Sequence, residues 1–324
     1  MAKERMAKGS LPKLPLKGRA HPARRKSNAR ARATKSPIEL AELLAEELPA
    51  LTQFRGQTVV VKYGGAAMEN EDLKAGVMSD IAALSSVGVS PVLVHGGGPE
   101  VSRWLERAGI EAHFVGGKRV TTDDAMEVVE MVLAGKVNKE LVSLACSYGA
   151  PAVGLTGRDM RMMEARREQS GTLGRVGEIT SVDAISLDDL LQSEYIPLIA
   201  TIAEDENDRG ALNINADDAA GEIASALGAD KLMLMTDVPG IMMDKNDPTS
   251  LVQHATLAEV QRMQDDGRVQ GGMIPKVECA TQAVKSGASS AHVIDGRTSH
   301  SLLLATLLEQ ADIGTQIVQQ DDGE

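Results

Sequence analysis

Two lysines beside glycine pairs have the chemistry expected of a phosphate site. Lys62 follows the β-branched run 58–61 and precedes Gly64 and Gly65, and Lys276 follows the glycine pair 271–272. A lysine at the end of a buried strand is costly unless it meets an anion, and glycines let backbone N–H groups approach a phosphate closely. One interpretation of this stretch is binding of nucleotide phosphates. The other is an ordinary turn with a lysine that reaches solvent.

A run of three glycines, 96–98, lies between an apolar stretch and Pro99. Proline suits the first turn of a helix, so Pro99 predicts a helix start with Gly97 and Gly98 directly before it. The first N–H groups of a helix have no partner inside the helix and carry partial positive charge. This pattern predicts an anion site, and a flexible connector is the alternative.

Three further polar residues are candidates for holding a substrate. Arg119 lies in a glycine-flanked loop, where it is either a solvated surface charge or a fork for a carboxylate. Asn213 and Asp217 come just before a predicted helix, where short polar side chains commonly cap the N-terminus. The functional alternative is that one asparagine binds a polar substrate while Asp217 pairs with lysines and holds them in place.

A turn at the end of a predicted strand contains the last candidates, Thr236, Asp237 and Gly240. Doubly wound folds bind nucleotide bases and ribose at such a position. The chain has neither the P-loop pattern nor the dinucleotide-binding glycine fingerprint, which argues against those two folds. The other histidines are scattered, and His95, next to the glycine run, has no cysteine or aspartate at ligand spacing, so we expect no metal site made by side chains.

Short apolar runs alternate with stretches of helical periodicity along most of the chain, which is long enough for one large α/β domain or two smaller ones. The expected strands are 58–62, 91–95, 150–155, 195–201, 231–235, 291–294 and 314–318. The expected helices are 72–87, 100–108, 123–134, 219–227 and 277–286. We expect residues 157–178, which are rich in glycine, to form hairpins or a flap.

The composition excludes several classes of protein. Two cysteines, Cys146 and Cys279, are too few for a disulfide framework or a cysteine-rich metal site. Six aromatic residues leave little for stacking nucleic-acid bases. After residue 36 the chain holds 22 basic and 45 acidic residues, which argues against a nucleic-acid partner. No apolar run approaches the roughly 18 residues of a membrane span, so we expect a soluble protein.

The N-terminal 36 residues differ sharply from the rest. They hold 12 of the 34 lysines and arginines and one acidic residue, Glu4. A basic, acid-poor leader with serine, alanine and proline is typical of an organelle transit peptide. A disordered basic tail that binds an anionic partner, or an artefact, remains an alternative. Residues 37–56 follow with an amphipathic helix, expected to end at Pro49, that either caps the sheet or packs against another subunit.

Six motifs together resemble the amino acid kinase superfamily, and within it the acetylglutamate kinase family. They occur in the family's order from about residue 58 to 318, and each is weak alone. They are Lys62-Tyr-Gly-Gly, His95-Gly-Gly-Gly-Pro, Gly117-Lys-Arg119-Val-Thr, Asn213-Ile-Asn-Ala-Asp217, Thr236-Asp-Val-Pro-Gly and Gly271-Gly-Met-Ile-Pro-Lys276. The residues after Lys62 are most similar to the forms from photosynthetic organisms. This agrees with a plastid protein if the leader is a transit peptide, and a cytoplasmic one otherwise.

The resemblance implies a three-layer αβα sandwich with a mainly parallel central sheet. It places an acetylglutamate-binding half at about 57–210 and an ATP-binding half at about 211–324. The implied reaction is ATP-dependent phosphorylation of the γ-carboxylate of N-acetyl-L-glutamate, the second step of arginine biosynthesis, with Mg²⁺ held mainly by phosphate oxygens. The rival readings are glutamate 5-kinase, aspartokinase, carbamate kinase, uridylate kinase, or a catalytically silent nucleotide sensor.

The resemblance also implies roles for the candidate residues. Lys62 and Lys276 are implied to stabilise the transition state, and Asp217 to orient them. The implied acetylglutamate-binding residues are Gly97, Gly98, Arg119 and Asn213. The implied nucleotide-binding residues are Gly64, Gly65, Thr236, Asp237 and Gly240.

The partners implied by the resemblance are further copies of the chain and a regulator. A homo-oligomer is expected, a dimer or a hexamer joined through the N-terminal helix, and binding of the PII signal protein is a hypothesis. Arginine inhibition stays open because Ala305 and one extra residue in 309–314 depart from the pattern of arginine-inhibited members.

Overall fold

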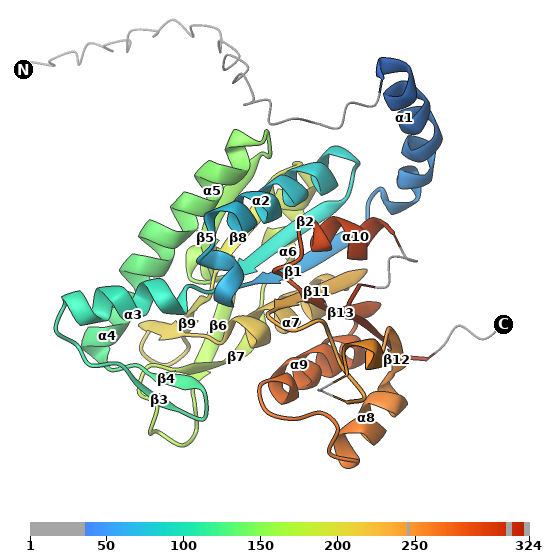
Figure 1. The fold of residues 1–324 in the computed structure, drawn as a ribbon. Helices are drawn as coiled ribbons and strands as arrows, with labels where there is room; N and C mark the ends of the chain where they lie inside the picture. Colours follow the sequence, from blue (N-terminus) through green and yellow to red (C-terminus); the bar gives the residue numbers. More distant parts are fainter. Residues whose placement is uncertain (1–35, 245–246, 309–312, 321–324) are drawn as a thin grey trace, which may run out of the picture. The chain divides into compact units, whose positions relative to one another are not determined.

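An eight-stranded, mainly parallel sheet is the centre of the computed structural model, which describes residues 36–244, 247–308 and 313–320 (Figure 1). Every neighbouring pair of its strands is parallel except β13 and β14. In spatial order the strands are β12 (His254–Thr256), β14 (Thr315–Val318), β13 (Ser290–Asp295), β11 (Lys231–Thr236), β1 (Thr58–Tyr63), β2 (Ser90–His95), β8 (Ile196–Ala200) and β5 (Ala152–Thr156). The expected α/β fold with a mainly parallel sheet is confirmed.

Helices cover both faces of this sheet and make the three layers. Successive side chains of a strand point to opposite faces, and Val61 accordingly belongs to one apolar core while Val60 belongs to the other. The first core includes side chains of α2 (Glu71–Ser86), α3 (Gly98–Arg107), α4 (Asp123–Glu130), α5 (Asn138–Ser147) and α10 (Ser301–Leu307). The second includes side chains of α6 (Ala184–Gln192), α7 (Ala216–Leu227), α8 (Leu257–Asp265) and α9 (Met273–Lys285).

Two smaller sheets extend the fold. One has the order β10 (Ala211–Asn213), β9 (Ile202–Asp205), β6 (Met163–Arg167) and β7 (Gly177–Val182). The other is the antiparallel hairpin of β3 (His113–Val115) and β4 (Lys118–Val120). β6 and β7 pair antiparallel, so the hairpin expected within 157–178 is confirmed, although β7 continues to Val182.

Several elements differ from the sequence-based expectation. The helix expected at 123–134 continues through a π-helical turn, Met131–Val137, directly into α5. The strand expected at 195–201 is interrupted at Thr201, where the chain leaves β8 for β9 in the second sheet. Short single-turn 3-10 helices complete the fold at Thr52–Phe54, Gly65–Met68, Asp159–Arg161 and Pro248–Ser250.

The first helix, α1 (Pro37–Leu51), spans the division at Glu46 between a short N-terminal unit and the large unit Glu47–Glu324. The expectation that Pro49 ends this helix is wrong, since the helix continues for two more residues. Pro49 lies in the last turn, where a missing N–H removes one helical hydrogen bond. Almost all of the basic leader, residues 1–35, lies outside the described residues, as does the expected insertion near Glu309.

Candidate active site

Two lysines from different parts of the chain meet at one carboxylate. Lys62 is near the end of β1, and its Nζ lies 2.9 Å from Oδ1 of Asp217. Lys276 is in the first turn of α9, and its Nζ donates to the other oxygen, Oδ2, over 3.1 Å. Sequence analysis proposed this meeting, and the structure brings the three side chains together.

Burial and charge act against each other on Asp217. The residue is 7% exposed, and burial by itself would raise the pKa of its carboxyl group. The ammonium groups of Lys62 and Lys276 outweigh this effect and hold the pKa of Asp217 below its ordinary value. The carboxylate is therefore kept charged between two cations. We call these three residues the charge clamp.

Helix capping and close packing hold Asp217 in place. Asn215 is the N-cap of α7, and its side chain accepts hydrogen bonds from the backbone N–H groups of Asp217 and Asp218. The thiol of Cys279 in α9 donates to the backbone oxygen of Asp217 over 3.0 Å. A Cβ at Gly221 would lie 3.0 Å from the sulfur of Cys279, so a glycine there lets α7 and α9 approach closely.

A small cavity of about 180 Å³ gathers the four residues expected to hold the acceptor substrate. Gly97 and Gly98 border it at the start of α3, Arg119 reaches it from β4, and Asn213 lies at the end of β10. The N-termini of α3 and α7 both line this cavity, so two helix ends favour an anion in it.

Arg119 is buried beside this cavity with part of its guanidinium unpaired. Its Nη2 donates to the backbone oxygen of Gly98 over 3.1 Å and to Oγ of Ser102 over 2.7 Å. Its Nη1 is buried and has no hydrogen-bond partner among the described residues. Burial also lowers the pKa of Arg119. The interpretation of Arg119 as a solvated surface charge is therefore wrong, since the residue is 8% exposed.

The two asparagines before α7 have different environments. Asn215 caps the helix, whereas Nδ2 of Asn213 donates to Oγ1 of Thr121 over 3.2 Å. That hydroxyl in turn donates to the backbone oxygen of Arg119 over 3.0 Å. Asn213 and Arg119 are thus joined through Thr121 at the rim of the small cavity.

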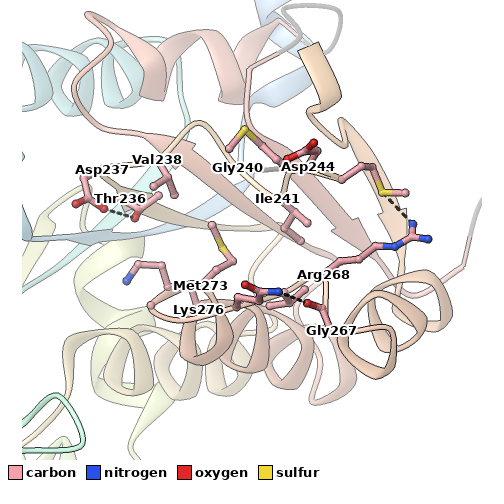
Figure 2. A pocket seen from close by; sticks show the side chains of 15 residues that line it. Thr236, Asp237, Val238, Gly240, Ile241, Asp244, Gly267, Arg268, Met273 and Lys276 are labelled. Carbon is pink, nitrogen blue, oxygen red and sulfur yellow. Dashed lines mark hydrogen bonds between the residues drawn. The ribbon is translucent and has the colours of Figure 1, made fainter. Parts of the chain in front are cut away.

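A larger cavity of about 740 Å³ lies at the ends of β11 and α9 (Figure 2). Thr236, Asp237, Gly240 and Lys276 line it, and Lys276 points into it from α9. This volume is within the range of sites for nucleotide-sized ligands. Because Lys276 lines the large cavity while Ala216, next to Asp217, lines the small one, the charge clamp lies between the two.

Comparison with known proteins identifies the family. A sequence profile of the amino acid kinase family matches residues 57–295. Acetylglutamate kinase of Gloeobacter violaceus is 50% identical over 88% of this chain and 95% of its own length. The chloroplastic acetylglutamate kinase of Arabidopsis thaliana is 50% identical over 87% of this chain and 81% of its own. The chain belongs to the amino acid kinase family.

An enzyme of known structure with a different name has the same fold as this amino acid kinase family member. N-acetylglutamate synthase of Neisseria gonorrhoeae, solved with coenzyme A and N-acetyl-glutamate, superposes with a TM-score of 0.73. The match covers 88% of this chain and 64% of that one at 22% identity, which establishes a common fold and no more.

Two of the residues that were expected to bind the nucleotide lie outside both cavities. Gly64 and Gly65 line neither of them. A Cβ at Gly64 would lie 3.6 Å from Cε of Lys62, and Gly65 has a φ of +68°, which favours glycine. Their approach to phosphates stays a prediction. Gly240 has a packing role in addition, because a Cβ there would lie 2.6 Å from Oγ1 of Thr315.

Sequence analysis missed a buried network beneath the glycine run. His95 is fully buried; its Nδ1 lies 2.8 Å from the backbone oxygen of Gly96, and its Nε2 lies 2.9 Å from Nδ2 of Asn138. The proton therefore belongs on Nδ1, and Asn138 donates to Nε2. Asn138 is in α5, an element that the sequence analysis did not predict, so no local signal pointed to it.

Further lining residues of the large cavity were also missed, among them Met243 and, labelled in Figure 2, Arg268 and Met273. Within the described ranges, no group of three or more His, Cys, Asp or Glu side chains is placed to hold a metal ion. None of the helices in that part of the chain is long and apolar enough to cross a bilayer.

Proposed function

We propose that this chain transfers the γ-phosphoryl group of ATP to the γ-carboxylate of N-acetyl-L-glutamate in arginine biosynthesis. The observation that carries the proposal is Arg119 at the small cavity, whose buried Nη1 has no hydrogen-bond partner in the part of the chain that the structure describes. A buried guanidinium nitrogen without a partner is costly unless an acceptor meets it, and the fork of an arginine suits a carboxylate. The names of relatives at 50% identity, both acetylglutamate kinases, support the same acceptor.

The two cavities suit two substrates of different size. We assign ATP to the large one, bordered by Thr236, Asp237 and Gly240, and acetylglutamate to the small one, where Gly97, Gly98 and Asn213 accompany Arg119. The Arg119 end of the small cavity then holds the α-carboxylate, and the γ-carboxylate extends toward the clamp. On this assignment, residues 57–210 supply most of the acceptor site and residues 211–324 the nucleotide site.

The reaction requires little covalent participation by the protein. A γ-carboxylate oxygen forms a bond to the γ-phosphorus while the bond from that phosphorus to the leaving oxygen of ADP breaks. Lys62 and Lys276 offset the negative charge on the phosphoryl oxygens, and Asp217 keeps both ammonium groups at one place. We propose that Mg²⁺ bound with ATP would supply further charge neutralisation and would be held mainly by phosphate oxygens.

The test is ADP release by the full chain with five acceptors: acetylglutamate, glutamate, aspartate, carbamate and UMP. We expect the highest kcat/KM with acetylglutamate, because glutamate carries a charged amino group in place of the acetamide. Turnover of none of the five would overturn the assignment and favour a nucleotide sensor. Preference for another acceptor would move the chain to that activity within the family.

The finer partner assignments are proposals from the likeness to photosynthetic relatives. We propose a plastid location, a homo-oligomer (a dimer, or a hexamer joined through the N-terminal helix) and binding of the PII signal protein. The molar mass measured by light scattering tests the oligomer, and a monomeric mass would refute it. A pull-down in ATP tests PII binding, and imaging of the tagged full chain tests the location.

A further inference from the structure

A short stretch of chain lies between β4 and β10, the strands of Arg119 and Asn213, and is hydrogen-bonded on both sides. We call residues 173–176, which precede β7, the bridge segment. The backbone N–H of Thr121 donates to Leu173 over 3.0 Å, and the N–H of Arg175 donates back to Thr121 over 2.6 Å. On the other side, the N–H of Asn213 donates to the backbone oxygen of Arg175 over 2.8 Å. The segment therefore fixes the spacing between β4 and β10.

The bridge segment approaches β4 as closely as backbones allow. Gly174 has a φ of +67°, and a Cβ there would lie 2.3 Å from the backbone oxygen of Thr121. No side chain fits in that space. Thr121 is two residues after Arg119, so a shift of the segment would reach the guanidinium through a short stretch of chain.

The side chain of Arg175 anchors the bridge segment to both of its neighbours. Its Nε donates to Oδ1 of Asp123, the first residue of α4, over 2.5 Å. Its Nη1 donates to the carboxylate of Asp208 over 2.8 and 3.0 Å. Asp123 follows β4 and Asp208 lies in the turn between β9 and β10, so one guanidinium joins the two strands by a second route. The Arg175 side chain is 20% exposed, whereas those of Asp123 and Asp208 are 80% and 42% exposed.

We propose that Arg175 is a positioning residue for the acceptor substrate, holding Arg119 and Asn213 at the separation that the substrate carboxylate requires. The proposal rests on the proposed function, since it assigns these two residues to acetylglutamate. Arg175 itself does not line the small cavity. Its effect therefore acts on acceptor binding and leaves the nucleotide site and the charge clamp unchanged.

The test compares Arg175→Met and Arg175→Lys with the unaltered chain. We expect the KM for acetylglutamate to rise about tenfold or more in both variants, while kcat and the KM for ATP stay within about threefold of the values for the unaltered chain. The reason is that the lost interaction stabilises the bound acceptor equally in the ground state and in the transition state. Lysine keeps the charge but cannot join Asp123 and Asp208 with one planar fork. Calorimetric binding of acetylglutamate gives the same comparison without turnover.

Two matched controls separate positioning from general loss of charge. Arg166→Met removes an arginine from β6 that pairs with Glu178 over 3.3 Å and, among the described residues, has no side-chain hydrogen bond or ion pair to the bridge segment. Asp123→Asn removes the charge of the carboxylate that pairs with Arg175, on a side chain that is 80% exposed. Asp124→Asn is its control, because it makes the same change one residue later. We expect the acceptor KM to rise with Asp123→Asn and to stay unchanged with Arg166→Met and Asp124→Asn.

A further variant displaces the guanidinium without removing it. A Cβ at Gly210 would lie 2.6 Å from Nη1 of Arg175, so Gly210→Ala should also raise the acceptor KM. An unchanged KM for acetylglutamate in both Arg175 variants would overturn the proposal. Equal rises in the KM for acetylglutamate and the KM for ATP, together with a lowered melting temperature, would also overturn it. If the unaltered chain does not turn over acetylglutamate, the proposed function itself fails, which is a separate result.

Discussion

Asp217 stabilises two positive charges that would repel each other without it. The side chains of Lys62 and Lys276 are 11% and 19% exposed, and each ammonium group lies within 3.1 Å of this one carboxylate. At such distances and low exposure, electrostatic interactions are strong. The clamp is thus preorganised, so the protein does not need to rearrange the two ammonium groups when charge moves between substrates.

Removing either lysine should affect the rate more than substrate binding. We expect Lys62→Ala and Lys276→Ala to lower kcat by about 10²–10³, the loss typical of one preorganised charge stabiliser, with much smaller changes in KM. Asp217→Asn should also lower kcat, because both lysines remain but lose their common partner. Steady-state kinetics with varied ATP and acetylglutamate measures these effects.

Lys285→Ala is the control for the lysine variants, since Lys285 is an exposed lysine at the other end of α9. It should leave kcat unchanged. A kcat close to that of the unaltered chain in Lys62→Ala or Lys276→Ala would remove that lysine from the transition state.

The residues of the clamp were predictable, but the state of Arg119 was not. Lys62, Asp217 and Lys276 each lie beside a glycine pair or a helix start, which are local signals in the sequence. Arg119 is held by hydrogen bonds to Gly98 and Ser102 of α3, and its guanidinium lies 4.7 Å from the centre of the Phe114 ring. Such contacts come from tertiary packing, and the loop sequence around Arg119 equally suits an exposed arginine.

At the level of elements, Gly174 provides a sharp test of the bridge segment. Gly174→Ala should destabilise the protein by about 1–3 kcal/mol, because alanine is strained at positive φ and its Cβ would push on Thr121. It should also raise the acceptor KM. Urea unfolding and steady-state kinetics measure the two effects.

Gly171→Ala is a matched control, since Gly171 has the same φ of +67° but a Cβ there would meet nothing within 4 Å. Both variants share the backbone strain, so the difference between them reports the contact with Thr121. Equal effects of the two substitutions would mean that this contact does not hold the bridge segment.

The strands of the central sheet were predictable because they are continuous apolar runs, whereas several shorter elements could not be predicted. β1, β2 and β11 are buried on both faces and therefore read as uninterrupted apolar stretches. α5 follows α4 through a π-helical turn without a stop signal. β9 and β10 have four and three residues, too few for an alternating pattern to identify them.

At the scale of the whole molecule, the sheet explains why residues far apart in sequence share one site. β1, β2, β8 and β11 are parallel neighbours, so their carboxyl ends lie along one edge. Lys62 lies near the carboxyl end of β1, the glycine run follows β2, and the turn that begins at Thr236 follows β11. Open α/β sheets commonly bind ligands at this edge.

Two buried histidines should make the stability of the whole protein depend on pH. Burial lowers the pKa of His95 to about 4 and, with Lys231 nearby, that of His292 to about 3. Because an unfolded histidine has a pKa of about 6.5, the unfolded chain binds protons between pH 6.5 and 4 while the folded one does not. The stabilising effect is complete above pH 6.5 and is lost as the pH falls through this window, by up to about 1.4 kcal/mol per histidine per pH unit.

The free energy of unfolding, measured in urea at several pH values from 7.5 to 4.5, should therefore fall less steeply in His95→Gln and His292→Gln than in the unaltered chain. Differences between variants cancel the titration of carboxylates, which is common to all of them. His113→Gln, at an exposed histidine on β3, controls for the change of residue type. If His95→Gln does not fold, His292→Gln still tests the prediction. If the free energy of unfolding of this variant changes with pH as steeply as that of the unaltered chain, the buried imidazole does not govern the acid sensitivity.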